Sequence, residues 1–162
     1  MGGAGSQGRV GLQVFDSGKR RHWVGEVTPV RILIVEDNEP DAYLVRTALR
    51  AAQIDFELTH AKDGVIALAI LDSASAKSSG PVADLIFLDL NMPTMDGFAL
   101  LTAMRLHPAS AEVPIAVLSS SLSHDDMARS RQLGANRYIV KPMELNDFMN
   151  LIAGAVKEIL KL

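Results

Sequence analysis

Short apolar runs alternate with longer segments of helical periodicity from Val30 to the C-terminus. This alternation is typical of repeated strand-helix-strand units, whose strands lie parallel in one sheet. The runs at 84–88 and 113–118 are continuously apolar, which predicts central strands covered on both faces. The pattern therefore predicts an α/β domain over residues 30–162. Its five strands are expected at 31–35, 55–60, 84–88, 113–118 and 137–140.

Capping residues predict where the first two helices begin and end. Asn38 is a good N-cap for a helix that runs to about Ala52. Asp63 opens a second helix, which is expected to end near Asp72. The small residues, glycine and proline of segment 73–81 are typical of a connector.

The last three helices also have clear boundary signals. The third is predicted from about Asp96 to Leu106, because Pro108 forbids its continuation. Ser123 is a suitable cap for the fourth helix, which Gly134 ends. The fifth carries one apolar stripe at helical spacing, which predicts that it packs on the sheet. That stripe consists of Leu145, Phe148, Met149, Ile152, Val156, Ile159 and Leu160.

Composition narrows the class of protein. The chain has 162 residues, 48% of them apolar, which is enough for one domain with an ordinary core. A net charge of -3 without a basic stripe argues against a nucleic-acid partner, and the absence of cysteine excludes thiolate chemistry. No apolar run approaches the ~20 residues that span a bilayer, and the N-terminus lacks the apolar core of a signal peptide. We expect a soluble, cytoplasmic protein without a membrane partner.

Residues 1–29 differ from the rest of the chain. They hold seven of the twelve glycines and a basic cluster at 19–22. Four basic residues against two acidic ones give the segment a charge of +2, which leaves -5 for residues 30–162. The composition predicts a flexible N-terminal extension, with a small docking or pairing element as the alternative.

Charged residues stand where three of the predicted strands end. Glu36 and Asp37 follow the first strand, Asp89 ends the third, and Lys141 follows the fifth. In an open parallel sheet, ligands bind outside the carboxyl ends of the strands. Clustered carboxylates repel one another unless a cation is present, and oxygen ligands suit Mg²⁺. We expect Asp37 and Asp89 to bind Mg²⁺ directly, Glu36 to act through water, and the backbone carbonyl of Asn91 to complete the set.

The same strand ends carry groups suited to phosphoryl transfer. Asp89 is a carboxylate at the mouth of a cleft, where it is able to attack phosphorus and form an acyl phosphate. The ammonium of Lys141 and the metal would compensate the phosphoryl charge. The Ser119 hydroxyl and the backbone N–H of Ser120, at the end of the fourth strand, would donate hydrogen bonds to phosphoryl oxygens.

Together these residues resemble a response-regulator receiver domain of two-component signalling. The resemblance covers residues 30–162 and rests on four features: the acid pair 36–37, the motif Asp-Leu-Asn-Met-Pro-Thr-Met-Asp-Gly at 89–97, Ser119, and the pair 141–142. It implies a flavodoxin-like, doubly wound sheet with strand order 2-1-3-4-5 and five helices on its two faces. It also implies that a phosphohistidine on a sensor histidine kinase or phosphotransfer protein passes its phosphoryl group to Asp89.

The resemblance assigns further roles. Ser119 and Tyr138 would form a switch, in which Tyr138 turns inward as Ser119 moves toward the phosphate. The bond between Lys141 and Pro142 is often cis in such domains. The switched surface would be the fourth helix, fifth strand and fifth helix, which would bind a downstream protein or form a homodimer. Such a domain is a signalling module rather than an enzyme.

Three features are similar to the small stand-alone regulators that serve phytochrome-type kinases. They are the long connector before Asp84, the segment 107–114 and the serine run after Leu118. Serine at position 119 departs from the commoner threonine, and without that methyl group the coupling to Tyr138 is less defined.

Other interpretations stay open at this point. Tyr138 is equally well explained as a core aromatic residue with its hydroxyl at the surface. A phosphohydrolase working through an aspartyl-phosphate is a second function, but the position for its general acid, two residues after Asp89, holds Asn91. A third is a receiver-like scaffold that never accepts phosphate. Such scaffolds usually lose an acid or the lysine, and this chain has both.

Overall fold

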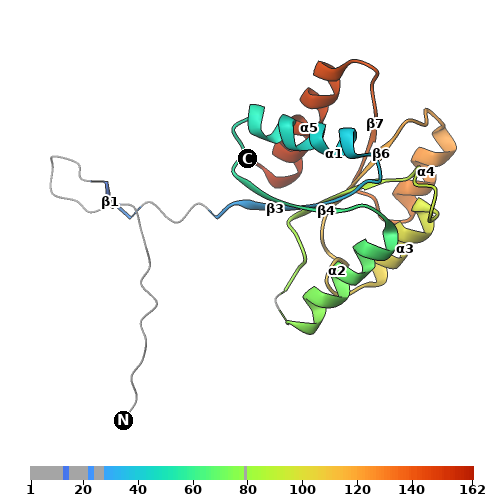
Figure 1. The fold of residues 1–162 in the computed structure, drawn as a ribbon, viewed down its shortest axis with the longest axis horizontal. Helices are drawn as coiled ribbons and strands as arrows, with labels where there is room; N and C mark the ends of the chain where they lie inside the picture. The colour runs from blue at the N-terminus through green and yellow to red at the C-terminus, as the bar shows by residue number, and fades with distance from the viewer. Residues whose placement is uncertain (1–12, 15–21, 24–27, 79) are drawn as a thin grey trace, which may run out of the picture.

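The structure is a computed structural model that describes residues 13–14, 22–23, 28–78 and 80–162. A five-stranded parallel sheet has the order β4-β3-β5-β6-β7 (Figure 1). Counted within this sheet the order is 2-1-3-4-5, which confirms the predicted doubly wound topology. Its strands are β3 (Val30–Val35), β4 (Phe56–Ala61), β5 (Leu85–Asp89), β6 (Ile115–Ser119) and β7 (Arg137–Val140).

Five helices cover the two faces of this sheet. One face packs against α1 and α5, and the other packs against α2 and α3, with α4 beside α3 (Figure 1). The helices are α1 (Glu39–Ala51), α2 (Gly64–Ala76), α3 (Gly97–Leu106), α4 (His124–Gln132) and α5 (Leu145–Leu160).

The predicted helix starts are confirmed by side-chain caps. Asn38 accepts a hydrogen bond from the third residue of α1, and Asp63 does the same for α2. Asp96 and Ser123 cap α3 and α4. These bonds satisfy backbone donors that the first turn of a helix leaves without partners.

The end of α2 differs from the prediction. The helix continues through Ala76 rather than stopping near Asp72, so the first four residues of the expected connector 73–81 are helical. Alanine has high helix propensity, and two alanines offset the serines there. Lys77 is the C-cap of the helix, and the next residue, Ser78, has a left-handed φ of 49°.

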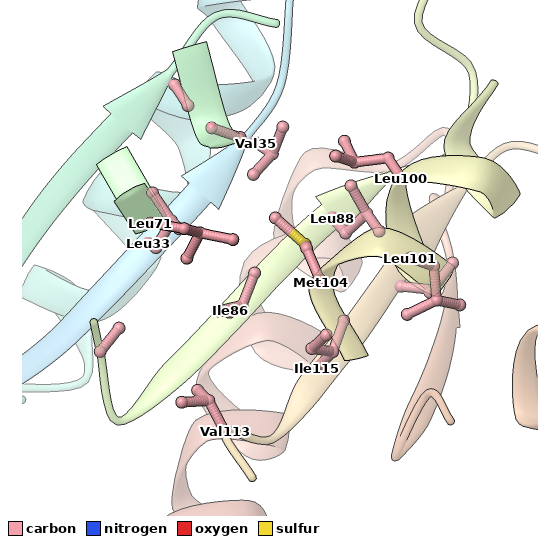
Figure 2. Packing of buried hydrophobic residues seen from close by; sticks show 14 of the residues in the cluster. Leu33, Val35, Leu71, Ile86, Leu88, Leu100, Leu101, Met104, Val113 and Ile115 are labelled. Carbon is pink, nitrogen blue, oxygen red and sulfur yellow. The ribbon is translucent and has the colours of Figure 1, made fainter. Parts of the chain in front are cut away.

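The core consists of two apolar clusters, one on each side of the sheet. Strand side chains alternate between them, so Leu33 and Val35 point to α2 and α3 while Ile32 and Ile34 point to α1 and α5. Figure 2 shows the first cluster, in which α2 and α3 residues meet the sheet. The labelled side chains are Leu33, Val35, Leu71, Ile86, Leu88, Leu100, Leu101, Met104, Val113 and Ile115. β5 and β6 are buried along their whole length, as predicted for central strands.

Arg105 fastens the loops at the opposite end of the sheet from the predicted site. Its guanidinium donates hydrogen bonds to the carbonyls of Gly134 and Val113 at 2.8 and 2.7 Å, and to Asn136 Oδ1 at 2.9 Å. The carbonyls of Ser110 and Ala111 accept further bonds. Burial lowers the pKa of Arg105 from its ordinary value. One cation therefore joins the end of α3 to the connection between α3 and β6 and to the connection between α4 and β7.

Before the main sheet, β1 (Gln13–Val14) and β2 (His22–Trp23) pair antiparallel as a separate two-stranded sheet. The flexible extension predicted for residues 1–29 otherwise lies almost entirely outside the described residues. None of the helices in the described part of the chain combines the length and hydropathy needed to cross a bilayer.

Candidate functional site

The carboxyl ends of four neighbouring strands bring together most of the side chains singled out in the sequence. Glu36 and Asp37 directly follow β3, Asp89 is the last residue of β5, Ser119 is the last of β6, and Lys141 directly follows β7. The sheet order places β3 beside β5, and β5 beside β6. The topology itself thus assembles the site.

Three carboxylates form a cluster. Glu36, Asp37 and Asp89 each offer an oxygen within 4.8 Å of the others. Glu36 and Asp89 are buried, whereas Asp37 is exposed. An all-oxygen set with one side open to solvent fits a hard divalent cation that keeps part of its water shell.

Lys141 is the cation next to this cluster. Its Nζ donates to Glu36 Oε2 and to Asp41 Oδ2, both at 2.8 Å, and lies 3.6 Å from Asp89 Oδ2. Its backbone N–H also donates to the carbonyl of Ser119, which fixes the residue after β7 against β6. Asp41 lies in the first turn of α1 and was not predicted to contact the site. Its role as a partner of Lys141 depends on how α1 sits on the sheet, for which the sequence has no signal.

The carboxylates around Lys141 offer more negative charge than its single ammonium group can balance. Burial raises the pKa of Glu36 to about 8, and the hydrogen bond from Lys141 offsets this only in part. The neighbouring Asp89 adds to the rise, because like charges disfavour each other. Burial also opposes the charge of Lys141, but its hydrogen bonds to Asp41 and Glu36 prevail and raise the pKa of the ammonium. A divalent cation would balance the excess negative charge of these carboxylates.

Glu36 is also held by a neighbour in its own loop and by one on β4. Its Oε1 accepts a hydrogen bond from the backbone N–H of Asn38 at 3.0 Å, and its carbonyl lies 2.7 Å from Nε2 of His60 on β4. These bonds fix the position of a buried acid whose side chain has no exposed surface. His60 was not predicted to contact the site.

Asn91 ties the loop after β5 to the end of β6. Its N–H donates to Asp89 Oδ1 at 3.0 Å, and its side-chain Nδ2 donates to the hydroxyls of Ser119 and Ser120, both at 3.2 Å. Ser119 is buried, whereas Asn91 and Ser120 are exposed. The sequence indicated the backbone carbonyl of Asn91 and the N–H of Ser120. The side-chain link between the two loops was not foreseen.

Ser121 connects this region to α4 and Tyr138. The Ser119 hydroxyl accepts from the N–H of Ser121, and the Ser121 hydroxyl donates to Asp126 Oδ2 at 2.6 Å. Tyr138 is half-buried against the core, and its hydroxyl donates to the carbonyl of Ser121 at 3.1 Å. A chain of hydrogen bonds therefore leads from Asn91 to the first turn of α4.

The expected cis bond before Pro142 is not present. Among the described residues every peptide bond is trans, including that between Lys141 and Pro142. Trans is the lower-energy form of an X–Pro bond. The two ion pairs and the backbone bond described above hold the lysine in place without a cis turn, so this expectation was wrong.

Comparison with known proteins identifies the family to which this fold belongs. The family described as the response regulator receiver domain matches residues 32–153. The chain belongs to this family. The receiver domain is similar to the response regulator Rcp1 of Synechocystis sp., with 36% identity over 126 residues, covering 78% of this chain and 86% of Rcp1. It spans 48% of the length of the transcriptional regulatory protein PrrA of Mycobacterium bovis, to which it is 37% identical over 123 residues, or 76% of this chain.

Solved structures agree with the receiver fold. The Mn²⁺-bound form of Rcp1 has a TM-score of 0.70 at 35% identity, covering 80% of this chain and 93% of the other. The phosphorylated cyanobacterial phytochrome response regulator RcpA has a TM-score of 0.73 at 32% identity, with 82% and 95% covered. The resemblance to receiver domains, including regulators of the phytochrome type, is thereby confirmed. Receiver domains are signalling phosphoacceptors that bind Mg²⁺ or Mn²⁺ at an acidic site, receive phosphoryl groups from histidine kinases and in some cases dimerise.

Proposed function

We propose that this chain is a single-domain response regulator that accepts a phosphoryl group on Asp89 in an Mg²⁺-dependent reaction. The observation that carries the proposal is the position of the Asp89 carboxylate, 3.6 Å from Lys141 Nζ and within the Glu36 and Asp37 cluster. A carboxylate between a cation-binding acid pair and an ammonium is suited to accept a phosphoryl group.

In the proposed reaction an Asp89 oxygen attacks the phosphorus of a phosphohistidine on a histidine kinase or phosphotransfer protein. The phosphorus–nitrogen bond breaks, and the leaving imidazole nitrogen keeps the electron pair and takes up a proton. Mg²⁺, held by Asp37, Asp89, the Asn91 carbonyl and, through water, Glu36, would supply charge compensation to the phosphoryl oxygens. Little further covalent chemistry is required of the protein.

Lys141, Ser119 and Ser120 would hold the product. The Lys141 ammonium already lies beside Asp89 and would pair with a phosphoryl oxygen in place of one of its acid partners. The Ser119 hydroxyl would exchange its bonds from Asn91 and Ser121 for one that it donates to the phosphoryl group, and the Ser120 N–H would donate another. These exchanges require only small movements, because every group already lies at the same strand ends.

The proposed output is a change in the surface formed by α4, β7 and α5. Moving Ser119 breaks its bond from the Ser121 N–H, and Ser121 is the residue that holds both Asp126 of α4 and the Tyr138 hydroxyl. Tyr138 would then turn inward, and the surface would bind a downstream protein or a second copy. The likeness to Rcp1 and RcpA supports a phytochrome-type kinase as the upstream partner in the cytoplasm.

A turnover enzyme is less well supported. A phosphohydrolase of this type carries its general acid two residues after the nucleophile. Here that position is Asn91, whose amide donates to Ser119 and Ser120. The arrangement suits retention of the phosphate rather than rapid release.

The test is the intact mass of the protein after incubation with Mg²⁺ and a small acyl-phosphate donor. We expect one phosphate adduct on the wild type, none on Asp89→Asn, and none when Mg²⁺ is chelated. Asp96→Asn is the matched control, because it changes an acid of the same loop, keeps a capping side chain and should leave labelling intact. A stable adduct on Asp89→Asn would refute the assignment of Asp89. No adduct on the wild type, together with failure to bind a beryllium fluoride analogue, would favour the phosphate-independent scaffold.

A further inference from the structure

One acid beside Lys141 has no part in the proposed metal set. Asp41 Oδ2 accepts a hydrogen bond from Lys141 Nζ at 2.8 Å, the same distance as Glu36 Oε2. The carboxylates that converge on a possible cation are Glu36, Asp37 and Asp89, and Asp41 stands outside this cluster. The lysine nevertheless lies nearer to Asp41 than to Asp89, whose Oδ2 is 3.6 Å from Nζ.

The hydrogen bonds at the start of α1 leave the Asp41 carboxylate available for the lysine. An acid at the third position of a helix commonly bonds back to the N–H of the N-cap residue. Here the N–H of the N-cap, Asn38, donates to Glu36 Oε1 at 3.0 Å instead. Asn38 Oδ1 accepts from the Asp41 N–H at 3.0 Å. The cap is therefore complete without the Asp41 carboxylate, which bonds across the fold to the loop after β7.

The two acids that hold Lys141 differ in their exposure to water. The Glu36 side chain has no exposed surface, whereas the Asp41 side chain is 30% exposed. A buried carboxylate that loses its partner keeps the full cost of desolvation, while an exposed one is hydrated. The positive end of the α1 dipole also favours a charge at Asp41. If the lysine gives up one of these acids, releasing Asp41 costs less than releasing Glu36.

We propose that Asp41 is the resting partner of Lys141 and competes with the phosphoryl group for its ammonium. When Asp89 carries phosphate, a phosphoryl oxygen would replace Asp41 Oδ2 at Lys141 Nζ, and the Asp41 carboxylate would turn to water. Asp41 thus weakens the hold of the site on a phosphoryl group and favours the unphosphorylated protein. It touches neither the phosphoryl group nor the metal in this proposal, so it is a positioning residue. The inference rests on the phosphoacceptor function proposed above and adds a residue that tunes it.

Asp41→Asn removes the competing charge and keeps the shape of the side chain, and it should change two affinities in opposite directions. A phosphoryl analogue on Asp89 would no longer compete for Lys141, so it should bind more tightly. Mg²⁺ should bind more weakly, because the ammonium is left with Glu36 and Asp89, which are acids of the metal set. A purely structural Asp41, which only fastened α1 to the loop after β7, would instead loosen the site and weaken both affinities.

The first experiment is titration calorimetry of the full chain with beryllium fluoride at saturating Mg²⁺. We expect Asp41→Asn to bind this analogue about fivefold more tightly than the wild type, the effect of one partly exposed ion pair. Asp41→Glu restores the charge and should return the affinity to within about twofold of the wild type. Glu39→Gln is the matched control, because it removes the same charge from the same turn of α1, where Glu39 pairs with Lys62 on the surface. Its affinity should stay within about twofold of the wild type as well.

A titration of the same proteins with MgCl₂ alone provides the second readout. We expect Asp41→Asn to bind Mg²⁺ about threefold more weakly than the wild type, with Glu39→Gln unchanged. Weaker binding of both Mg²⁺ and the analogue by Asp41→Asn would assign Asp41 a structural role and overturn the proposal. Unchanged affinity for the analogue would overturn it too, as would equal tightening in Glu39→Gln, which would point to net charge rather than to the pair with Lys141.

The behaviour of the wild type separates this inference from the function on which it rests. A wild type that binds the analogue with the same affinity as Asp41→Asn would refute the role of Asp41 and leave the phosphoacceptor function standing. A wild type that neither binds the analogue nor accepts phosphate would refute the phosphoacceptor function, and the role of Asp41 with it.

Discussion

The affinity of the acid cluster for Mg²⁺ should depend strongly on pH because Glu36 is buried. Burial raises the pKa of Glu36 to about 8, and the proton that it carries below that pH must leave before the acid can serve a cation. The perturbation is therefore simply pH, with Glu36→Gln as the variant that removes the titrating group. The window from pH 6 to 9 lies above the ordinary pKa of a glutamate, so an exposed acid would contribute no change there.

The expected change in Mg²⁺ affinity follows from the linkage between proton binding and metal binding at Glu36. At pH 8 the acid is about half ionised and at pH 6 about one per cent ionised, so Mg²⁺ should bind about 50-fold more weakly at pH 6 than at pH 8, or roughly 2.3 kcal/mol. The free energy of unfolding of the ion-free protein depends on pH in the opposite direction to the Mg²⁺ affinity. In the ion-free protein the folded-state pKa is raised from 4.5, so the contribution of Glu36 is fully present below that value and is lost as pH rises through about 8. The upper limit of that loss is about 5 kcal/mol.

Titration calorimetry with MgCl₂ at constant ionic strength is the assay for the affinity. The Glu36→Gln protein should bind Mg²⁺ more weakly at pH 8 but with little change between pH 6 and 8. Glu39→Gln is the matched control, because Glu39 is an exposed acid three residues away and pairs with Lys62 on the surface. Urea unfolding of the ion-free proteins should show the wild type losing stability relative to Glu36→Gln as pH rises. Equal affinity of the wild type at pH 6 and pH 8 would refute the argument.

Three further predictions concern the framework of the domain. Arg105→Lys should destabilise the domain by about 3 kcal/mol in urea unfolding, because an ammonium cannot reproduce the forked bonds to several carbonyls; unchanged stability would mean that those bonds are replaced by water. Gly97→Ala would bring a Cβ to 2.5 Å from Leu90 Cα, so we expect a cost of about 1–3 kcal/mol and slower labelling in the mass assay. Ser121→Ala removes the 2.6 Å bond to Asp126 and should speed hydrogen exchange of α4 amides by about tenfold while the sheet amides keep their protection.

Most of the fold was predictable because local signals and burial agree. Each of the five strands of the main sheet was located to within two residues at either end, and the caps at Asn38, Asp63, Asp96 and Ser123 begin the helices where expected. The exceptions involve weak signals. Serine and alanine after Asp72 are compatible with both helix and connector, and packing of α2 on the core decides for helix.

The site was predictable to the extent that the sheet builds it. Acids and a lysine at the ends of parallel strands must meet at one edge, so Glu36, Asp89 and Lys141 could be grouped from the sequence. Contacts from helices and loops could not, because they depend on how α1 sits on the sheet and on side-chain rotamers. Asp41 and Ser121 are the examples.

Few contacts hold α4 against the rest of the domain, and this affects how much signal the protein gives before it is phosphorylated. Of the nine residues of this helix only Ser130 is buried, and one of its contacts with α3 is the stacking of Arg129 over the Phe98 ring at 4.2 Å. Displacing such a helix exposes little apolar surface, so opening costs little. Shifting a two-state equilibrium from 1:99 to 99:1 takes about 5.5 kcal/mol. If displacing α4 costs little free energy, the ratio of displaced to docked helix before phosphorylation is already less extreme than 1:99. If phosphorylation acts by moving α4, a fraction of the unphosphorylated protein already has this helix displaced. That fraction limits the change in signal that phosphorylation produces, and the residues that hold α4 in place determine how large it is.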